Sequence, residues 1–506
     1  MSGTPGMLTR RIPDLRLSAM PPRERIPSDD SAAIGSVPGS GMPVGAEGAV
    51  AHRPPIPCRA GRARGALFRM VRAAVLLAAT VVTADHVFVT SFRPHRVQGG
   101  SMVPCLIGEH HRVTCDGCGR GFAVLPMPDG RLPPIVVCPH CGRRVAISTE
   151  NATWHVGDLV WNLRSPYFFR RPRRWEMVGL RDPAAASRML VKRIVGLPGE
   201  SVAIREGDLF VNGRICRKPW PLVREMSAPL PLAEDSRGPR ALPCPVRLAS
   251  PATNYCHFHP GWDQLEFPTR DLVLLFSLTE FSAKGKDAGG KLKIRADDGD
   301  RGWIVTFDFA AKRMAIEQGG TEDDPGGMEL WTTLPRVLEN WVRRPNPKPP
   351  LPVAVSLVDR RLLVAVQDRP VFESTYDPPP LTRSLIQPFV VEAEGATGRL
   401  ADLRVLRDVY YLPPYDVVTP TPEPLPDGKA GASSDSRAES SFFPLRLPGE
   451  EFADVLQASF TVRVPPGKYL VLGDDSHSSM DGRYWRPDFC IASEQILGRT
   501  VVLRMR

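Results

Sequence analysis

The segment MLVKRIVGLPGE, residues 189–200, predicts a strand that ends in a tight turn. Its residues are mostly apolar apart from Lys192 and Arg193, and the Pro-Gly pair at 198–199 is a turn signal. A charged lysine is costly to bury, so burial would lower its pKa and leave it a base near neutral pH. A second interpretation stays open, in which Lys192 points outward from the strand.

Segments with the pattern of short strands recur along the rest of the chain. They lie at 157–163, 208–214, 272–278, 303–309, 361–372, 400–412, 459–464, 468–475 and 496–505. A chain of 506 residues exceeds one ordinary core, and its 54 prolines favour loops and strands over long helices. We therefore expect a mainly β protein of two or three folded units. In it, a β-sandwich at 221–418 would interrupt a first β domain, which closes after a linker at 419–445.

The amino-terminal side carries much of the net charge of +10 and is rich in Pro, Gly, Ser and Arg. Residues 1–65 predict a disordered basic tail. Arginines then precede an apolar run at 73–84, which favours a transmembrane anchor over 66–92 with the tail on the cytoplasmic side. The rest of the chain would then be exoplasmic. A buried amphipathic helix is the alternative for this run.

Two further segments contain residues suited to catalysis. In QGGSMVPCL, residues 98–106, Ser101 follows two glycines that permit unusual backbone angles. LGDDSHSSMDGRYW, residues 472–485, is dense in small, polar and acidic side chains. Taken singly, the first is an ordinary turn and the second is a loop or a cation site.

Taken together and in order, the three segments resemble type I signal peptidases. That family carries boxes of the form GxSMxPTL, KRxxGLPGD and GDNxxxSxDSRYWG, and this chain has GGSMVPCL, KRIVGLPGE and GDDSHSSMDGRYW. GDLVWNL at 157–163 and PRRWEMVGL at 172–180 also resemble the box between nucleophile and lysine. The resemblance implies a signal-peptidase-type β catalytic domain formed by residues 93–220 and 446–506. It also implies a single-pass protein of the cell membrane that removes signal peptides from secreted preproteins.

The resemblance further implies a Ser/Lys dyad, with Ser101 as nucleophile and Lys192 as general base. Ser479 matches the serine that orients the lysine, while Asp481 and Arg483 match a structural ion pair.

Met102 would help to line the substrate groove, and the Ser101 N–H would hold the oxyanion. Some relatives supply a serine hydroxyl at the position of Gly99, so a side-chain donor is missing here. Cys105, Glu200 and Gly482 replace the family's threonine, aspartate and serine, and none of these changes removes a catalytic group.

Two CxxC pairs, Cys115 with Cys118 and Cys138 with Cys141, have the spacing of a zinc ribbon, which we place at 112–146. Two local disulfides or a redox pair are the alternatives. Four thiolates leave no open position on a metal, so we expect a structural zinc and no cofactor for catalysis. Signal peptidases generally lack this ribbon.

Residues 353–372 and 403–411 weakly resemble lectin-like or laminin-G-like sandwiches, which suggests a glycan or protein ligand for this region. The acidic residues Asp297, Asp298 and Asp300 are expected to form a solvated turn. A membrane between tail and ribbon argues against nucleic acid as a partner. The rival functions are a self-cleaving Ser/Lys regulatory protease and a catalytically inactive surface protein that binds glycans or proteins.

Overall fold

The computed structural model describes residues 10–11, 69–80, 93–414 and 460–502. Short gaps fall at 128, 186, 234–237, 262–265, 284–288, 300–301, 320–328, 346, 379–380, 382–383 and 486. The predicted linker at 419–445 and nearly all of the predicted tail at 1–65 therefore lie outside the described residues.

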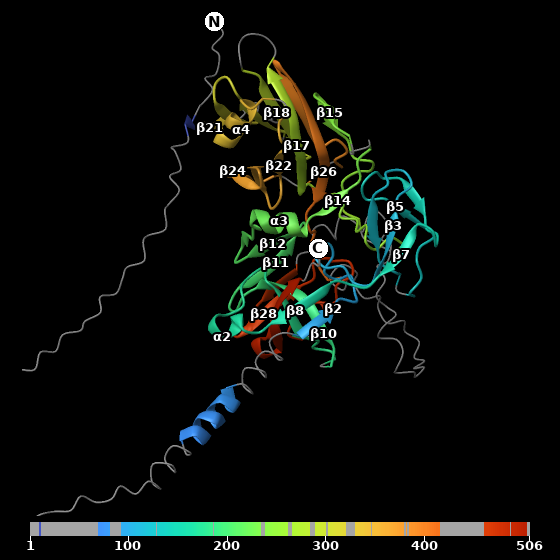
Figure 1. Ribbon diagram of the computed structural model, residues 1–506, viewed down its shortest axis with the longest axis vertical. Coiled ribbons are helices and arrows are strands. Elements are labelled where there is room, and N and C mark those ends of the chain that lie inside the picture. The colour runs from blue at the N-terminus through green and yellow to red at the C-terminus, as the bar shows by residue number, and fades with distance from the viewer. Residues whose placement is uncertain are drawn as a thin grey trace, which may run out of the picture. The chain divides into compact units, whose positions relative to one another are not determined.

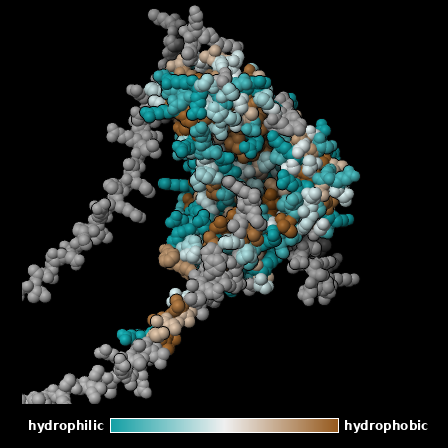
Figure 2. Space-filling view, in the orientation of Figure 1, coloured by the Kyte–Doolittle hydropathy of each residue, from teal (hydrophilic) through white to brown (hydrophobic). Residues whose placement is uncertain are grey.

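Residues 69–80 form a helix within a unit of their own that spans 13–89. Figure 2 shows apolar and polar side chains together on the surface of this helix. Among the described residues, none of the helices combines the length and the apolar character needed to cross a membrane. The remainder of the predicted anchor at 66–92 is outside the described residues.

A seven-stranded sheet carries Lys192 and combines strands from distant parts of the chain (Figure 1). Its order is β2 (Arg93–Arg96), β8 (Leu159–Leu163), β30 (Ile496–Val502), β9 (Met177–Arg181), β10 (Met189–Gly196), β28 (Lys468–Leu472) and β29 (Ile491–Ala492). The strand β10 pairs antiparallel with β9 on one side and with β28 on the other. The lysine strand is therefore an inner strand, held by chain from both sides of the 221–418 region.

A four-stranded sheet shares buried apolar side chains with β28 of the sheet that carries Lys192. It consists of β13 (Arg214–Ile215), β12 (Asp208–Val211), β11 (Ser201–Arg205) and β27 (Phe460–Arg463). Buried side chains of β11, β27 and β28 form one apolar cluster with Val409 and Tyr411. Short helices lie beside these sheets: α2 (Pro166–Phe169) and α3 (Trp220–Met226).

Two further sheets share a single apolar core between residues 228 and 407. The first has the order β1 (Arg10–Arg11), β21 (Glu329–Thr333), β20 (Arg313–Gln318), β19 (Gly302–Asp308), β18 (Lys291–Asp297), β25 (Phe389–Glu394) and β16 (Cys244–Val246). The second consists of β14 (Ala228–Leu230), β26 (Ala396–Arg407), β17 (Leu272–Ala283), β22 (Leu351–Ser356), β23 (Arg361–Val366) and β24 (Arg369–Thr375), with β15 (Arg240–Ala241) also paired to β26. Because alternate side chains of both sheets fill the same core, this region is a β-sandwich.

The expected single strand at 361–372 is two strands, β23 and β24, joined as a hairpin. Gln367 and Asp368 lie between them with φ of 50° and 62°. Two consecutive left-handed residues reverse the chain, so the apolar run on each side belongs to a separate strand. The sandwich region also contains the helix α4 (Arg336–Val342).

The cysteine-rich segment forms a small unit with two sheets. One contains β4 (Gly121–Val124), β3 (His110–Thr114) and β7 (Ala152–His155), and the other pairs β5 (Ile135–Val137) with β6 (Arg144–Ala146). Its core includes Val113, Phe122, Val136 and the cysteine side chains. The described residues as a whole are mainly β, as expected.

Candidate active site

Ser101, Lys192 and Ser479 lie together although they are distant in sequence. Lys192 Nζ donates hydrogen bonds to Ser101 Oγ at 2.8 Å and to Ser479 Oγ at 3.0 Å. Ser101 sits in a turn closed by the Val103 N–H, which donates to the Gly100 carbonyl at 3.1 Å. The interpretation in which Lys192 points outward is wrong, because only 2% of its surface is exposed.

The surroundings of Lys192 favour its neutral form. Burial lowers the pKa of this amine from its usual value near 10.5 to about 8. The Asp481 carboxylate opposes this shift, while the positive charges of Arg483 and Arg188 add to it. An amine with this pKa is available as a base in a useful fraction of molecules near neutral pH.

Asp481 and Arg483 form a fully buried ion pair. Arg483 Nε and Nη2 each lie 2.9 Å from one carboxylate oxygen of Asp481, and the Gly473 N–H donates to Asp481 at 2.9 Å. Arg483 Nη1 also donates to the Leu412 carbonyl at 2.9 Å, where the chain leaves the sandwich. Burial alone would raise the pKa of Asp481, but the charge and hydrogen bonds of Arg483 outweigh it and lower this pKa. The pair thus fixes the loop that presents Ser479.

The next residue on β10 makes a second buried ion pair that the sequence did not reveal. Arg193 Nε and Nη2 donate to the two Asp474 oxygens, each at 2.7 Å. Because neighbouring residues of a strand face opposite ways, Lys192 and Arg193 bind the 472–485 segment through different faces of β10. The lysine strand is therefore held to this segment twice.

The three departures from the family boxes fit their surroundings. Cys105 Sγ accepts a hydrogen bond from Arg193 Nη2 at 3.2 Å, and Glu200 pairs with Arg174 at 2.5 Å. At Gly482, a Cβ would lie 2.6 Å from the Phe489 carbonyl oxygen, so a serine would not fit without movement.

A cleft of about 470 Å³ opens onto Ser101. Its lining includes residues 95–102, Arg188 with the start of β10 at 189–192, and the side chains of His259, Ser478 and Met480. Met102 lines it and packs against Leu106 and Val160. Gly99 is exposed, and a Cβ there would meet no atom within 4 Å.

His259 is a residue of this cleft that sequence reasoning missed. It comes from the sandwich connection between β16 and β17, and its Nε2 lies 3.0 Å from Asp475 Oδ2. The ring packs so closely on the backbone at Gly100 that a Cβ there would lie 2.4 Å from His259 Cε1. The C-x-x-H spacing of Cys256 and His259 was the available signal, and it stood far from the three boxes.

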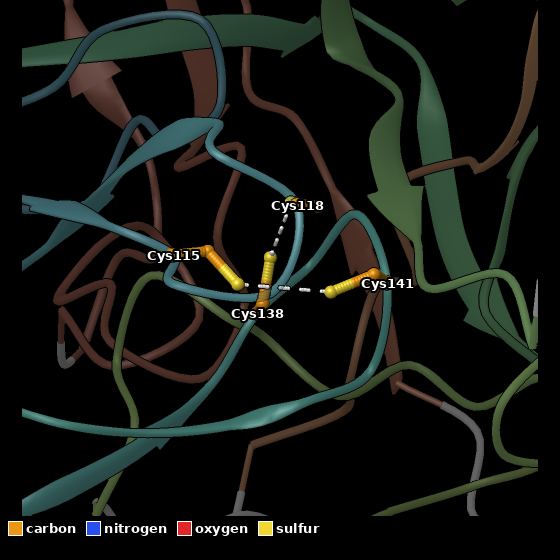
Figure 3. Close-up of side chains that lie close together, drawn as sticks. All are labelled: Cys115, Cys118, Cys138 and Cys141. Carbon is orange, nitrogen blue, oxygen red and sulfur yellow. Dashed lines mark hydrogen bonds between the residues drawn. The ribbon is translucent and has the colours of Figure 1, made fainter. Parts of the chain in front are cut away.

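The four cysteines at 115, 118, 138 and 141 point their sulfur atoms toward one another (Figure 3). Cys115 Sγ and Cys141 Sγ are 3.7 Å apart, as are Cys118 Sγ and Cys138 Sγ. Zinc–sulfur bonds of about 2.3 Å give a tetrahedron with edges of about 3.8 Å, whereas a disulfide bond is about 2.05 Å. Gly119 and Gly142, with φ of 66° and 71°, close matching turns after each pair. This cluster could hold a structural metal ion.

Two segments of the chain, 136–236 and 427–505, match the family described as "Signal peptidase, peptidase S26". Signal peptidase I V of Bacillus subtilis (strain 168) is 29% identical over 70 residues, which are 14% of this chain and 40% of that protein. These matches confirm the resemblance to type I signal peptidases. The chain spans less than half the length of the curated relative that it matches. Lys192, Ser479, Asp481 and Arg483 fall inside the matched segments, and Ser101 precedes them.

Solved structures give two further likenesses. A signal peptidase I from Enterococcus faecalis V583 is 29% identical, with 10% of this chain and 43% of that chain covered, at a TM-score of 0.10. Sheep galectin-11 is 8% identical, with 34% of this chain and 98% of that chain covered at a TM-score of 0.20.

Proposed function

We propose that this protein is a serine endopeptidase that removes signal peptides from secreted preproteins with a Ser101/Lys192 dyad. The observation that carries the proposal is the 2.8 Å contact between Lys192 Nζ and Ser101 Oγ in a site where burial lowers the lysine pKa to about 8. A buried amine next to a hydroxyl at the floor of a cleft is suited to activate that hydroxyl.

In the acylation step, neutral Lys192 takes the proton of Ser101 Oγ as the oxygen attacks the scissile carbonyl carbon. The resulting tetrahedral oxyanion is held by the Ser101 N–H. Protonated Lys192 then gives its proton to the leaving amine as the peptide bond breaks, which leaves an acyl ester on Ser101. A water molecule then gives a proton to Lys192 as it attacks the ester, and Lys192 passes this proton to Ser101 Oγ as the ester bond breaks and the cleaved signal peptide leaves.

Ser479 positions the base. Its Oγ accepts a hydrogen bond from Lys192 Nζ, and the backbone carbonyl of Ser479 in turn accepts one from Arg483 Nη2 at 3.3 Å. These contacts hold the lysine in one rotamer, which reduces the entropy that must be lost on reaching the transition state.

The substrate would lie extended in the cleft beside the 95–102 segment and the start of β10. By resemblance, it would carry small residues before the cut. Signal peptidases of this family are membrane-associated in general, and we propose that the 66–92 segment anchors this chain with its catalytic residues on the exoplasmic side. We also propose that the four-cysteine cluster holds a structural zinc ion. A glycan or protein ligand of the sandwich, and the exclusion of nucleic acid, stay predictions.

The proposal is tested with the full chain in detergent, incubated with a preprotein. Wild type is expected to cut after the signal peptide, as read from the new amino terminus, and Ser101→Ala and Lys192→Ala are expected not to cut. Cleavage by either variant at the wild-type rate would exclude the dyad. Membrane fractionation separates this function from that of a soluble self-cleaving regulator.

A further inference from the structure

A second cluster of side chains of the types that bind metals lies against the turn at Gly100 and Ser101, which we call the nucleophile turn. Cys256 and His259 belong to the connection between β16 and β17, and Asp475 belongs to the 472–485 segment. Cys256 Sγ lies 3.6 Å from Asp475 Oδ2, and His259 Nε2 lies 3.0 Å from the same oxygen. All three side chains are buried, with 2% to 4% of their surface exposed.

The residue types and the 3.6 Å between Cys256 Sγ and Asp475 Oδ2 fit a tetrahedral zinc site, whereas the 3.0 Å between His259 Nε2 and Asp475 Oδ2 is a hydrogen-bond distance that must lengthen by about 0.3 Å when the ion binds. Bonds of about 2.0–2.3 Å from zinc to oxygen, nitrogen and sulfur place neighbouring ligand atoms about 3.3–3.8 Å apart. A thiolate, an imidazole and a carboxylate are all zinc ligands, and a cation beside a buried carboxylate stabilises its charged form. Cys256 and His259 are the two ends of a turn, in which the His259 N–H donates a hydrogen bond to the Cys256 carbonyl at 3.1 Å.

The backbone around these ligands is held in place by other contacts. Arg407 of β26 donates to the Tyr255 carbonyl at 2.9 and 3.2 Å, and the Leu125 N–H donates to the Phe258 carbonyl at 2.9 Å. Ser478 Oγ donates to Asp475 Oδ2 at 2.7 Å. Such surrounding hydrogen bonds orient ligands and strengthen metal binding.

We propose that Cys256, His259 and Asp475 bind a zinc ion separate from the four-cysteine cluster. Three protein ligands leave the fourth position of the ion for a water molecule. Binding converts the Cys256 thiol to a thiolate and releases its proton to solvent. The ion joins the sandwich connection to the segment that carries Ser479.

This site is connected to the nucleophile turn. The Asp475 N–H donates to the Ser101 carbonyl at 3.1 Å, and the His259 ring packs on Gly100. The ion thereby fixes the backbone on both sides of the Ser101 side chain. This last consequence rests on the proposed peptidase function, whereas metal binding itself does not.

The test is the zinc content of the purified full chain after dialysis against a weak chelator, measured by elemental mass spectrometry. Wild type is expected to retain two zinc ions per chain, and Cys256→Ser and His259→Ala one each. The Cys118→Ser variant, altered in the other cluster, is expected to lose one zinc ion, and Cys118→Ser with Cys256→Ser to lose both. The matched control is Cys244→Ser, a buried cysteine of β16 in neither cluster, which should retain two.

The zinc ion that Cys256→Ser should retain at the four-cysteine cluster is the evidence that this variant is folded. His259→Cys, which replaces one zinc ligand by another, should restore the second ion that His259→Ala loses. The proposal is overturned if Cys256→Ser holds as much zinc as Cys244→Ser, since the His259–Asp475 contact would then be a hydrogen bond without a metal. None of these readouts depends on peptidase activity, so failure here is distinct from failure of the proposed function.

Discussion

Ser479 Oγ lies 3.0 Å from Lys192 Nζ, although 287 positions separate the two residues. The contact exists because β10 pairs with β28, which leads directly into the segment that carries Ser479. A base in the first part of the chain is thus oriented by a hydroxyl that follows the sandwich.

Ser479→Ala should lower kcat with little change in KM. Loss of one hydrogen bond to the lysine corresponds to about 1–2 kcal/mol, or about 5- to 30-fold in rate. Ser479→Thr keeps the hydroxyl and should recover part of this loss, while the exposed Ser493→Ala should cleave like wild type. Steady-state kinetics on a peptide substrate measure the effect; a change confined to KM would show that Ser479 does not act through the lysine.

The pH dependence of cleavage should follow the ionisation of Lys192. Its pKa of about 8 is lowered by burial, and only the neutral amine accepts the Ser101 proton. We therefore expect kcat/KM to rise about tenfold per pH unit below this value and to level off above it. A profile measured between about pH 6 and pH 10 that is flat, or that falls with rising pH, is incompatible with a lysine base.

Gly100→Ala should destabilise the protein, whereas Gly99→Ala should not. A Cβ at Gly100 would lie 2.4 Å from His259 Cε1 and 2.7 Å from Leu125 Cδ2, while one at Gly99 meets nothing within 4 Å. Overpacking of this kind costs about 1–3 kcal/mol, and substitutions without such contacts change stability by about 0.5 kcal/mol or less. Thermal unfolding of the two variants compares them directly. Equal melting temperatures would mean that His259 does not pack on the nucleophile turn.

Arg483→Ala should be far more damaging than the loss of a surface ion pair. Removing one partner of a buried pair leaves Asp481 as an uncompensated charge, at a cost of about 3–5 kcal/mol. The control is Lys468→Ala, which breaks a pair with the exposed Asp488 and should cost less than about 1 kcal/mol. Denaturant unfolding at neutral pH gives both values.

The same pair predicts a loss of stability in acid. The folded pKa of Asp481 lies below its unfolded value, so its contribution is present at neutral pH and is lost as the pH falls through the folded pKa. In Arg483→Ala this part of the acid dependence should shrink. Identical acid dependence in the variant and in wild type would assign the acid sensitivity to other groups.

The sequence predicted the elements that depend on local pattern. The apolar run around Lys192 lies in β10, and the segment at 272–278 lies within β17, because strands of alternating or fully buried residues leave a clear local signal. The helices α3 and α4 were not anticipated, since seven residues each are too few to establish a helical period. The turn at Gln367 and Asp368 also escaped notice, because it contains neither glycine nor proline.

Only those residues of the candidate site that belong to the three family boxes could be predicted from the sequence. Ser101, Lys192 and Ser479 belong to those boxes, and the structure brings them within hydrogen-bonding distance. The pairing of Arg193 with Asp474 and that of His259 with Asp475 depend on how distant strands and loops meet. Local periodicity carries no information about such contacts, so one sequence alone does not reveal them.

Covalent labelling of Ser101 tests the central claim most directly. A peptide bearing a serine-reactive electrophile at its carboxyl end would be incubated with the full chain, and the modified residue identified by mass spectrometry of the digest. We predict a single adduct on Ser101 Oγ, which is absent from Ser101→Ala and forms much more slowly in Lys192→Ala. An adduct on another residue, or equal labelling rates in wild type and Lys192→Ala, would contradict the assignment of Ser101 as nucleophile and Lys192 as its base.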